Sequence, residues 1–84
     1  MYYLYILQCA DKTLYTGITT DIKRRIAEHN KSQLGAKYTK NRRPVKLVYA
    51  KKFKNRSTAT KAEARIKKLK KSEKLKMIIS SPFR

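Results

Sequence analysis

The chain has 84 residues and a formal net charge of +18 at neutral pH, with 23 lysines and arginines against 5 acidic residues. A chain of this length forms one small domain, and so large a positive charge indicates an anionic partner, most often nucleic acid. One cysteine, Cys9, excludes an internal disulfide, and a single histidine, His29, leaves almost no possibility of a structural zinc site. The apolar start is too short for a membrane span and lacks a signal peptide's basic segment, so we expect a cytoplasmic protein.

Two strands joined by a polar turn are predicted at the start of the chain. Residues 3–8 are rich in aromatic and branched side chains, which is typical of a strand buried on both faces. Residues 14–17 form the return strand of a hairpin, after a turn at residues 10–13. Lys12 lies where a tight two-residue turn would favour glycine, which indicates a longer loop.

Three helices and a third strand are predicted downstream. The first helix begins at a cap on Thr20 or Asp21 and runs to about residue 30. A basic loop follows up to Pro44, then a strand at 45–50, a helix from a cap at 55–58 to about residue 70, and a short helix capped at 72–73 that ends at 79. The order β-β-α-β-α-α indicates an α+β domain over residues 1–79, with a frayed tail at 80–84.

The first helix carries two candidate functional residues. Ile22 and Ile26 define its inward face, and Arg25 and His29 fall on or beside that face, one turn apart, while Glu28 points elsewhere. In the structural interpretation, Arg25 reaches out to the rim and His29 packs half-buried. In the functional interpretation, both line a cleft in which Arg25 binds the oxygens of a phosphate.

Glu63 is the candidate metal ligand. It lies at the edge of the apolar stripe of its predicted helix, whereas the other four acidic residues lie in a turn, at helix starts or on an outer face. One carboxylate with water and substrate phosphate is a common way to hold Mg²⁺. The alternatives are an ion pair with a nearby lysine or a capping box with Thr60.

Tyrosines and basic residues complete the candidate set. Tyr5 and Tyr15 lie on the two strands of the hairpin, where most tyrosines serve packing, but a tyrosine near a metal and an arginine can act as a base or orient water. Lysines in the second half of the chain form a solvated face that attracts phosphate backbones without reading sequence. We expect nucleic acid to contact the basic and aromatic side chains of the first helix and its following loop, which are Lys23, Arg24, Lys37, Tyr38, Arg42 and Arg43.

The ordered set of these residues resembles the GIY-YIG nuclease family. Residues 3–5 and 15–17 resemble its two tyrosine motifs, Arg25 and His29 follow at the family's spacing, and Glu63 lies in a segment similar to the helix that carries the metal-binding glutamate. The loop at 35–39 followed by Arg43-Pro44 is similar to the small stand-alone bacterial members of UPF0213 type and to the Slx1-like branch. The resemblance covers about residues 2–78.

The resemblance implies a three-stranded antiparallel sheet flanked by helices and hydrolysis of phosphodiesters with Mg²⁺ or another divalent cation. By that match, Tyr15 or Tyr5 would activate water, Arg25 would stabilise the pentavalent phosphate, His29 would carry a proton or contact phosphate, and Glu63 would hold the metal. Ile18 departs from the pattern, because several family nucleases have a lysine there, and Lys37 is the candidate substitute.

Two functions follow from these observations. The first is an endonuclease acting on branched, flapped or damaged DNA, with targeting by a protein partner because no second domain is present in the chain. The second is a non-catalytic, RNA- or ribosome-associated binding module, which the charge alone would explain. An inward arginine and a carboxylate beside a core stripe favour the nuclease.

Overall fold

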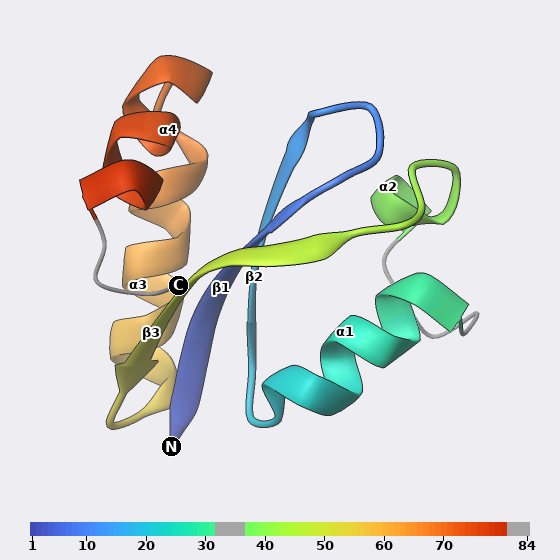
Figure 1. The fold of residues 1–84 in the computed structure, drawn as a ribbon. Helices are drawn as coiled ribbons and strands as arrows, with labels where there is room; N and C mark the ends of the chain where they lie inside the picture. Colours follow the sequence, from blue (N-terminus) through green and yellow to red (C-terminus); the bar gives the residue numbers. More distant parts are fainter. Residues whose placement is uncertain (32–36, 81–84) are drawn as a thin grey trace.

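The structure is a computed structural model that describes residues 1–31 and 37–80, without the side chains of residues 37 and 38. Three antiparallel strands form one sheet in the order β2-β1-β3 (Figure 1). They are β1 (Tyr2–Gln8), β2 (Leu14–Thr19) and β3 (Lys46–Phe53). The helices are α1 (Ile22–Lys31), the four-residue α2 (Lys37–Lys40), α3 (Arg56–Lys67) and α4 (Lys71–Ser80). The α+β class and the predicted order of strands and longer helices are confirmed.

The two faces of the sheet are covered by different helices. Tyr5 pairs with Gly17 on β2 and with Ala50 on β3, and directly opposed residues of antiparallel strands share a face. That face packs against α1, while the side chains that alternate with Tyr5 along β1, such as Leu4, lie on the face covered by α3. Figure 1 shows α1 on one side of the sheet and α3 with α4 on the other.

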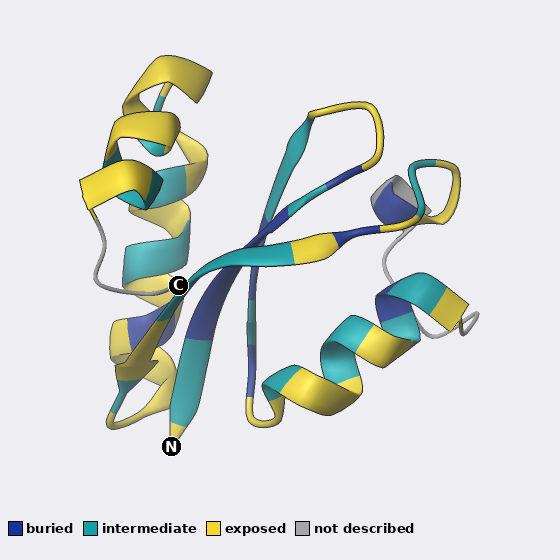
Figure 2. Cartoon of the chain, viewed as in Figure 1, coloured by how far each residue is buried: buried dark blue, intermediate teal, exposed yellow. Residues whose placement is uncertain are grey.

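The core is concentrated on the central strand. All four residues from Leu4 to Leu7 are buried, as predicted for a strand that is covered on both faces (Figure 2). By contrast, no residue of α4 is buried. The core therefore supports β1 and its two neighbours firmly, while α4 rests on the surface of this framework.

The hairpin turn and the helix caps have the residue types that were expected from the sequence. Lys12 adopts a left-handed backbone with φ of 71°, the conformation for which glycine is favoured, inside a loop longer than two residues. Asp21 Oδ1 accepts a hydrogen bond from the Arg24 N–H and caps α1, one of the two predicted caps. Asn55 caps α3 by accepting from the Thr58 N–H at 3.0 Å.

Several boundaries differ from the prediction. The segment expected to be a continuous loop contains α2, β3 extends to Phe53, and α3 ends at Lys67 rather than near residue 70. The helix stops there because α4 begins at once: Glu73 Oε1 accepts from the Lys70 N–H and caps the new helix. Within residues 1–31 and 37–80, no helix is long and apolar enough to cross a membrane.

Candidate active site

Gly17 allows Tyr5 to reach the edge of the sheet. A Cβ atom placed on Gly17 would lie 2.5 Å from the Tyr5 hydroxyl oxygen and 2.7 Å from Cζ, well inside contact distance. The tyrosine ring therefore passes directly over the glycine backbone of the edge strand β2. A glycine is required here for space, since its φ lies outside the left-handed region.

The Tyr5 hydroxyl begins a buried hydrogen-bonded chain. Its oxygen lies 3.0 Å from His29 Nε2, and His29 Nδ1 lies 2.8 Å from Thr39 Oγ1. Tyr5, His29 and Thr39 are all less than 2% exposed. The chain links β1, α1 and α2, so the imidazole is held at both nitrogens.

Tyr15 completes a cluster of three rings. Its ring centroid lies 5.2 Å from that of His29 and 6.4 Å from that of Tyr5, and the His29 and Tyr5 centroids are 5.9 Å apart. The two pairs with His29 have edge-to-face geometry, a favourable arrangement of aromatic rings. Unlike Tyr5 and His29, Tyr15 is only partly buried and gives the cluster a solvent-facing side.

Arg25 lies at the rim of this cluster and is paired with Glu28. Arg25 Nη1 is 2.9 Å from Glu28 Oε1, and both side chains are largely shielded, with 26% and 20% exposed. The expectation that Glu28 points away from the inward face is wrong. It accompanies Arg25 because residues three apart are neighbours on a helix, and a partly buried guanidinium needs a counter-charge.

Burial and neighbouring charge set the protonation states of the cluster. Burial raises the pKa of Tyr5 to about 12, against the opposing effect of a hydrogen bond with Arg25. Burial lowers the pKa of His29 to about 4, and the positive charges of Arg25 and Arg43 act in the same direction. At neutral pH the cluster therefore holds a neutral phenol and a neutral imidazole beside a positive Arg25, whose pKa is raised mainly by its hydrogen bond to Glu28.

Glu63 approaches the cluster from the other side of the sheet. It belongs to α3, which packs against β1 and β2, and its negative charge is one of the smaller causes that raise the pKa of Tyr5. Its Oε2 lies 3.5 Å from Lys67 Nζ, so the ion pair weighed as an alternative does form, with a half-exposed lysine. The Tyr5 hydroxyl at the β2 edge thus contacts His29 and Arg25, and the charge of Glu63 acts on it from α3.

The residues suit a metal bound by one carboxylate. In the part of the chain that the structure describes, no three histidine, cysteine, aspartate or glutamate side chains gather in one place. Glu63 is a hard oxygen donor with 21% of its side chain exposed, and its lysine partner is held only at 3.5 Å. Such a carboxylate fits Mg²⁺, which keeps several waters and commonly binds through one or two carboxylates and substrate phosphates.

The predicted nucleic-acid contacts divide into two groups. Lys23 and Arg24 are exposed on α1, and Arg24 is only loosely paired with Glu28, at 3.7 Å. Arg42 pairs with Asp11 at 3.1 Å, and Arg43 donates hydrogen bonds to the carbonyl oxygens of His29 and Glu28 at the end of α1. The side chains of the other two predicted contacts, Lys37 and Tyr38, lie outside the described part of the structure.

Two residues that hold the cluster in place, Thr39 and Glu28, were not predicted as site residues from the sequence. Thr39, which holds His29, lies in a polar segment without periodicity, so no pattern could have revealed it. Glu28 could have been found from its spacing of three from Arg25. Ile18, where the family pattern has a lysine, pairs with Leu4 and so lies on the opposite face of the sheet from Tyr5.

The chain belongs to the GIY-YIG family, because residues 1–76 match the GIY-YIG catalytic domain, and this match points to a nuclease-type domain. The family is one of nuclease-type hydrolases that generally depend on a divalent metal and bind nucleic acid.

Among individual proteins, the chain is 54% identical to a UPF0213 protein of Syntrophus aciditrophicus over 98% of this chain and 94% of that protein. It is 52% identical to a UPF0213 protein of Staphylococcus haemolyticus, over 92% and 93% of the two chains. The solution structure of the UPF0213 protein BH0048 of Bacillus halodurans superposes with a TM-score of 0.61, at 40% identity over 99% of this chain and 90% of that one. The relation to the Slx1-like branch stays a prediction.

Proposed function

We propose that the protein is a Mg²⁺-dependent endonuclease that hydrolyses phosphodiester bonds in structured or damaged DNA. The observation that carries the proposal is the cluster at the β2 edge: the Tyr5 hydroxyl lies 3.0 Å from His29 Nε2 and is hydrogen-bonded with Arg25, and the negative charge of Glu63 helps to raise its pKa. A surface that only attracts phosphate has no need for a buried phenol-imidazole pair behind its arginine or for a carboxylate near them.

In this proposal each side chain has a separate task. Arg25, with its guanidinium at the rim, stabilises the charge that develops on the phosphate oxygens, while Glu28 and Tyr5 hold it in place. Tyr15 meets the attacking water, because it is the less buried of the two tyrosines. Tyr5 orients Arg25 rather than acting as the base, since a phenol with a pKa of about 12 keeps its proton.

His29 serves the site from behind. It is fully buried, which favours a role as the hydrogen-bond partner of Tyr5 over direct contact with phosphate. Glu63 would hold the metal, which supplies further positive charge to the phosphoryl group when bound. Lys23 and Arg24, both exposed on α1, would contact the flanking phosphates.

The alternative is a non-catalytic module that binds RNA or the ribosome, and the net charge of +18 favours it to the same degree as it favours DNA. We further propose that targeting depends on a protein partner. The free thiol of Cys9 supports a location in the reducing cytoplasm.

The test is cleavage of a panel of structured DNAs and RNAs with Mg²⁺ or EDTA. We expect Arg25→Ala and Glu63→Gln each to lower Mg²⁺-dependent cleavage by at least about 100-fold, with binding in EDTA largely retained. Lys67→Ala is the matched control for Glu63, because it removes the ion pair and keeps the carboxylate. Cleavage at the normal rate in Glu63→Gln would contradict the metal site, and no cleavage of any substrate would favour the binding module.

A further inference from the structure

A strongly basic groove lies at the opposite edge of the sheet from the tyrosine cluster. It has a volume of about 510 Å³ and is formed by the end of β3, the turn that follows and one side of α3. We call it the β3 groove. Its cations are Lys51, Lys52, Lys54, Lys61 and Arg65, and Phe53 also lines it.

No acidic residue of the chain neutralises this groove. All five carboxylates lie in the described part of the structure and none lines the groove. Three of them pair with arginine or lysine side chains elsewhere, and the remaining two, Asp21 and Glu73, accept hydrogen bonds from backbone N–H groups at helix starts. Five cations close together without a counter-charge repel one another, so an anionic ligand would stabilise them.

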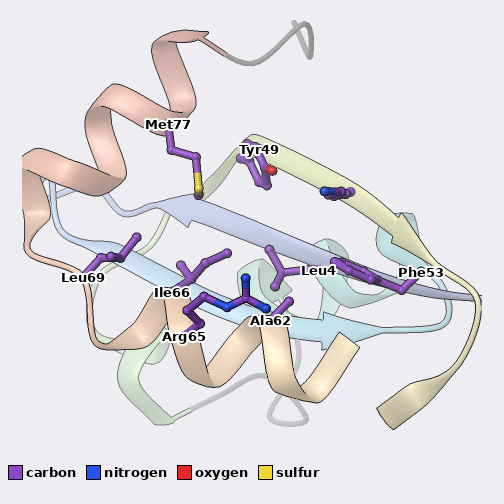
Figure 3. Close-up of a pocket in the computed structure, with 9 residues that line it drawn as sticks. Leu4, Tyr49, Phe53, Ala62, Arg65, Ile66, Leu69 and Met77 are labelled. Atoms are coloured by element: carbon purple, nitrogen blue, oxygen red, sulfur yellow. The ribbon is translucent and has the colours of Figure 1, made fainter. Parts of the chain in front are cut away.

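An apolar pocket of about 270 Å³ adjoins the β3 groove. The two hollows share Lys51, Phe53 and Arg65. Figure 3 shows Phe53 and Tyr49 on β3 turned towards Ile66 on α3, with Met77 reaching in from α4. The Lys51 ammonium lies 5.6 Å from the centre of the Phe53 ring, at the boundary between groove and pocket.

The combination matches the chemistry of an unpaired nucleic-acid strand. Proteins that bind single strands pair a positive groove, which follows the phosphates, with aromatic side chains on which bases stack. The pocket is slightly smaller than the roughly 300 Å³ typical of the smallest ligand sites, which suits one planar base and excludes a base pair. Its far wall can adjust, because Met77 is flexible and its helix contains no buried residue.

We propose that the β3 groove binds single-stranded DNA, with phosphates along the five cations and one unstacked base in the adjoining pocket. The choice of DNA over RNA rests on the proposed function. The proposal that the groove binds a single strand rests on its charge and lining residues instead.

The two sites would hold different segments of the substrate. The tyrosine cluster lies over β2 and the groove lies at β3, with β1 between them. Neighbouring strands are about 4.8 Å apart, so the two edges are separated by roughly 10 Å within the sheet alone. A strand in the groove would therefore be an unpaired arm beside the segment that is cut.

The test is fluorescence anisotropy in EDTA with labelled oligothymidylate of about 12 nucleotides, a length that single-strand-binding domains cover. We expect Lys54→Ala/Lys61→Ala to weaken binding and to reduce the salt slope by about 1.4, since each phosphate contact on a single strand contributes roughly 0.7. The control Lys68→Ala/Lys76→Ala removes the same charge from two exposed positions outside both hollows, one directly after α3 and one on α4. An equal loss in the control would overturn the groove and leave only general charge attraction.

Phe53→Leu tests the base pocket, and we expect about tenfold weaker binding with an unchanged salt slope. A second measurement needs no variant: a strand of the same length with abasic residues should bind the unmodified protein about tenfold more weakly. Equal affinity for the two strands would overturn the base pocket.

Oligouridylate of equal length tests whether the groove prefers DNA to RNA, and tighter binding of the RNA would overturn the choice of DNA. Because EDTA prevents cleavage, binding without cleavage in Mg²⁺ would support the groove and contradict the nuclease. Cleavage in Mg²⁺ together with unaltered binding by the groove variants would support the nuclease and contradict the groove.

Discussion

His29 makes stability depend on pH. Its pKa is lowered to about 4 in the folded protein, mainly by burial, against about 6.5 for an unperturbed histidine. Below about pH 6.5, His29 is protonated in the unfolded chain but stays neutral in the folded chain, so the free energy of unfolding falls as the pH falls towards 4. At 1.36 kcal/mol per pKa unit, the loss from this residue is about 3 kcal/mol at most.

His29→Gln should therefore be less stable than the natural chain at pH 7, because it breaks a buried hydrogen-bonded chain, and this difference should shrink as the pH is lowered. Urea unfolding of both proteins between about pH 7 and pH 4 measures the difference, and the contributions of the carboxylates cancel in it. A difference that stays constant over this range would show that His29 titrates normally in the folded protein.

Gly17→Ala tests how tightly Tyr5 is placed over the edge strand. The added methyl group would meet the Tyr5 hydroxyl at 2.5 Å, so we expect a loss of about 1–3 kcal/mol in the free energy of unfolding, typical of overpacking. The same substitution in a Tyr5→Phe background should cost less, because the closest atom is gone, although Cζ remains at 2.7 Å. Additive losses in this double-mutant cycle would mean that the two residues do not interact.

At the scale of single residues, the sequence predicted Arg25 and His29 because both share a helix face with Ile22 and Ile26. It did not predict the contacts that fix them. Thr39 reaches His29 across ten residues of chain, from a segment whose polarity resembles any loop. Periodicity reports which face of a helix is buried, whereas a hydrogen-bonded partner depends on how two separate segments pack.

At the scale of elements, α3 connects the two proposed sites, since it carries Glu63 and one wall of the β3 groove. Asn55 begins it by accepting hydrogen bonds from the N–H and hydroxyl of Thr58. Asn55→Ala should lower the free energy of unfolding by about 1 kcal/mol and speed hydrogen exchange in the first turn of α3. Asn41→Ala, at an exposed turn, is the control, and equal losses in both variants would contradict the capping role.

The elements themselves were largely predictable. A run of aromatic and branched residues followed by a polar turn predicts the hairpin, and Asn55 is a typical helix cap in the sequence. The short α2 was not predicted, because a four-residue helix has too few positions to show a period. The apolar pocket could not be predicted either: it exists because α4, which has no buried residue, meets the sheet only partly, and that depends on packing between distant segments.

At the scale of the whole molecule, the charge of +18 is distributed over both edges of the sheet. One edge joins Arg25 to the tyrosine cluster, and the other presents five cations beside an apolar pocket. Charge of this kind binds any phosphate backbone, so discrimination between substrates must come from shape. A substrate that reaches both edges with different segments would be favoured over one that reaches a single edge.

We therefore expect the protein to bind a DNA duplex with an unpaired single-stranded arm at least about tenfold more tightly than a blunt duplex of equal charge, measured by competition in EDTA. The arm adds contacts in the β3 groove, so Lys54→Ala/Lys61→Ala should remove most of this preference while Lys68→Ala/Lys76→Ala keeps it. Arg25→Ala should leave the preference in place, because Arg25 lies over β2 at the other edge. A preference that survives in the groove variant would mean that the unpaired arm is recognised at another part of the surface.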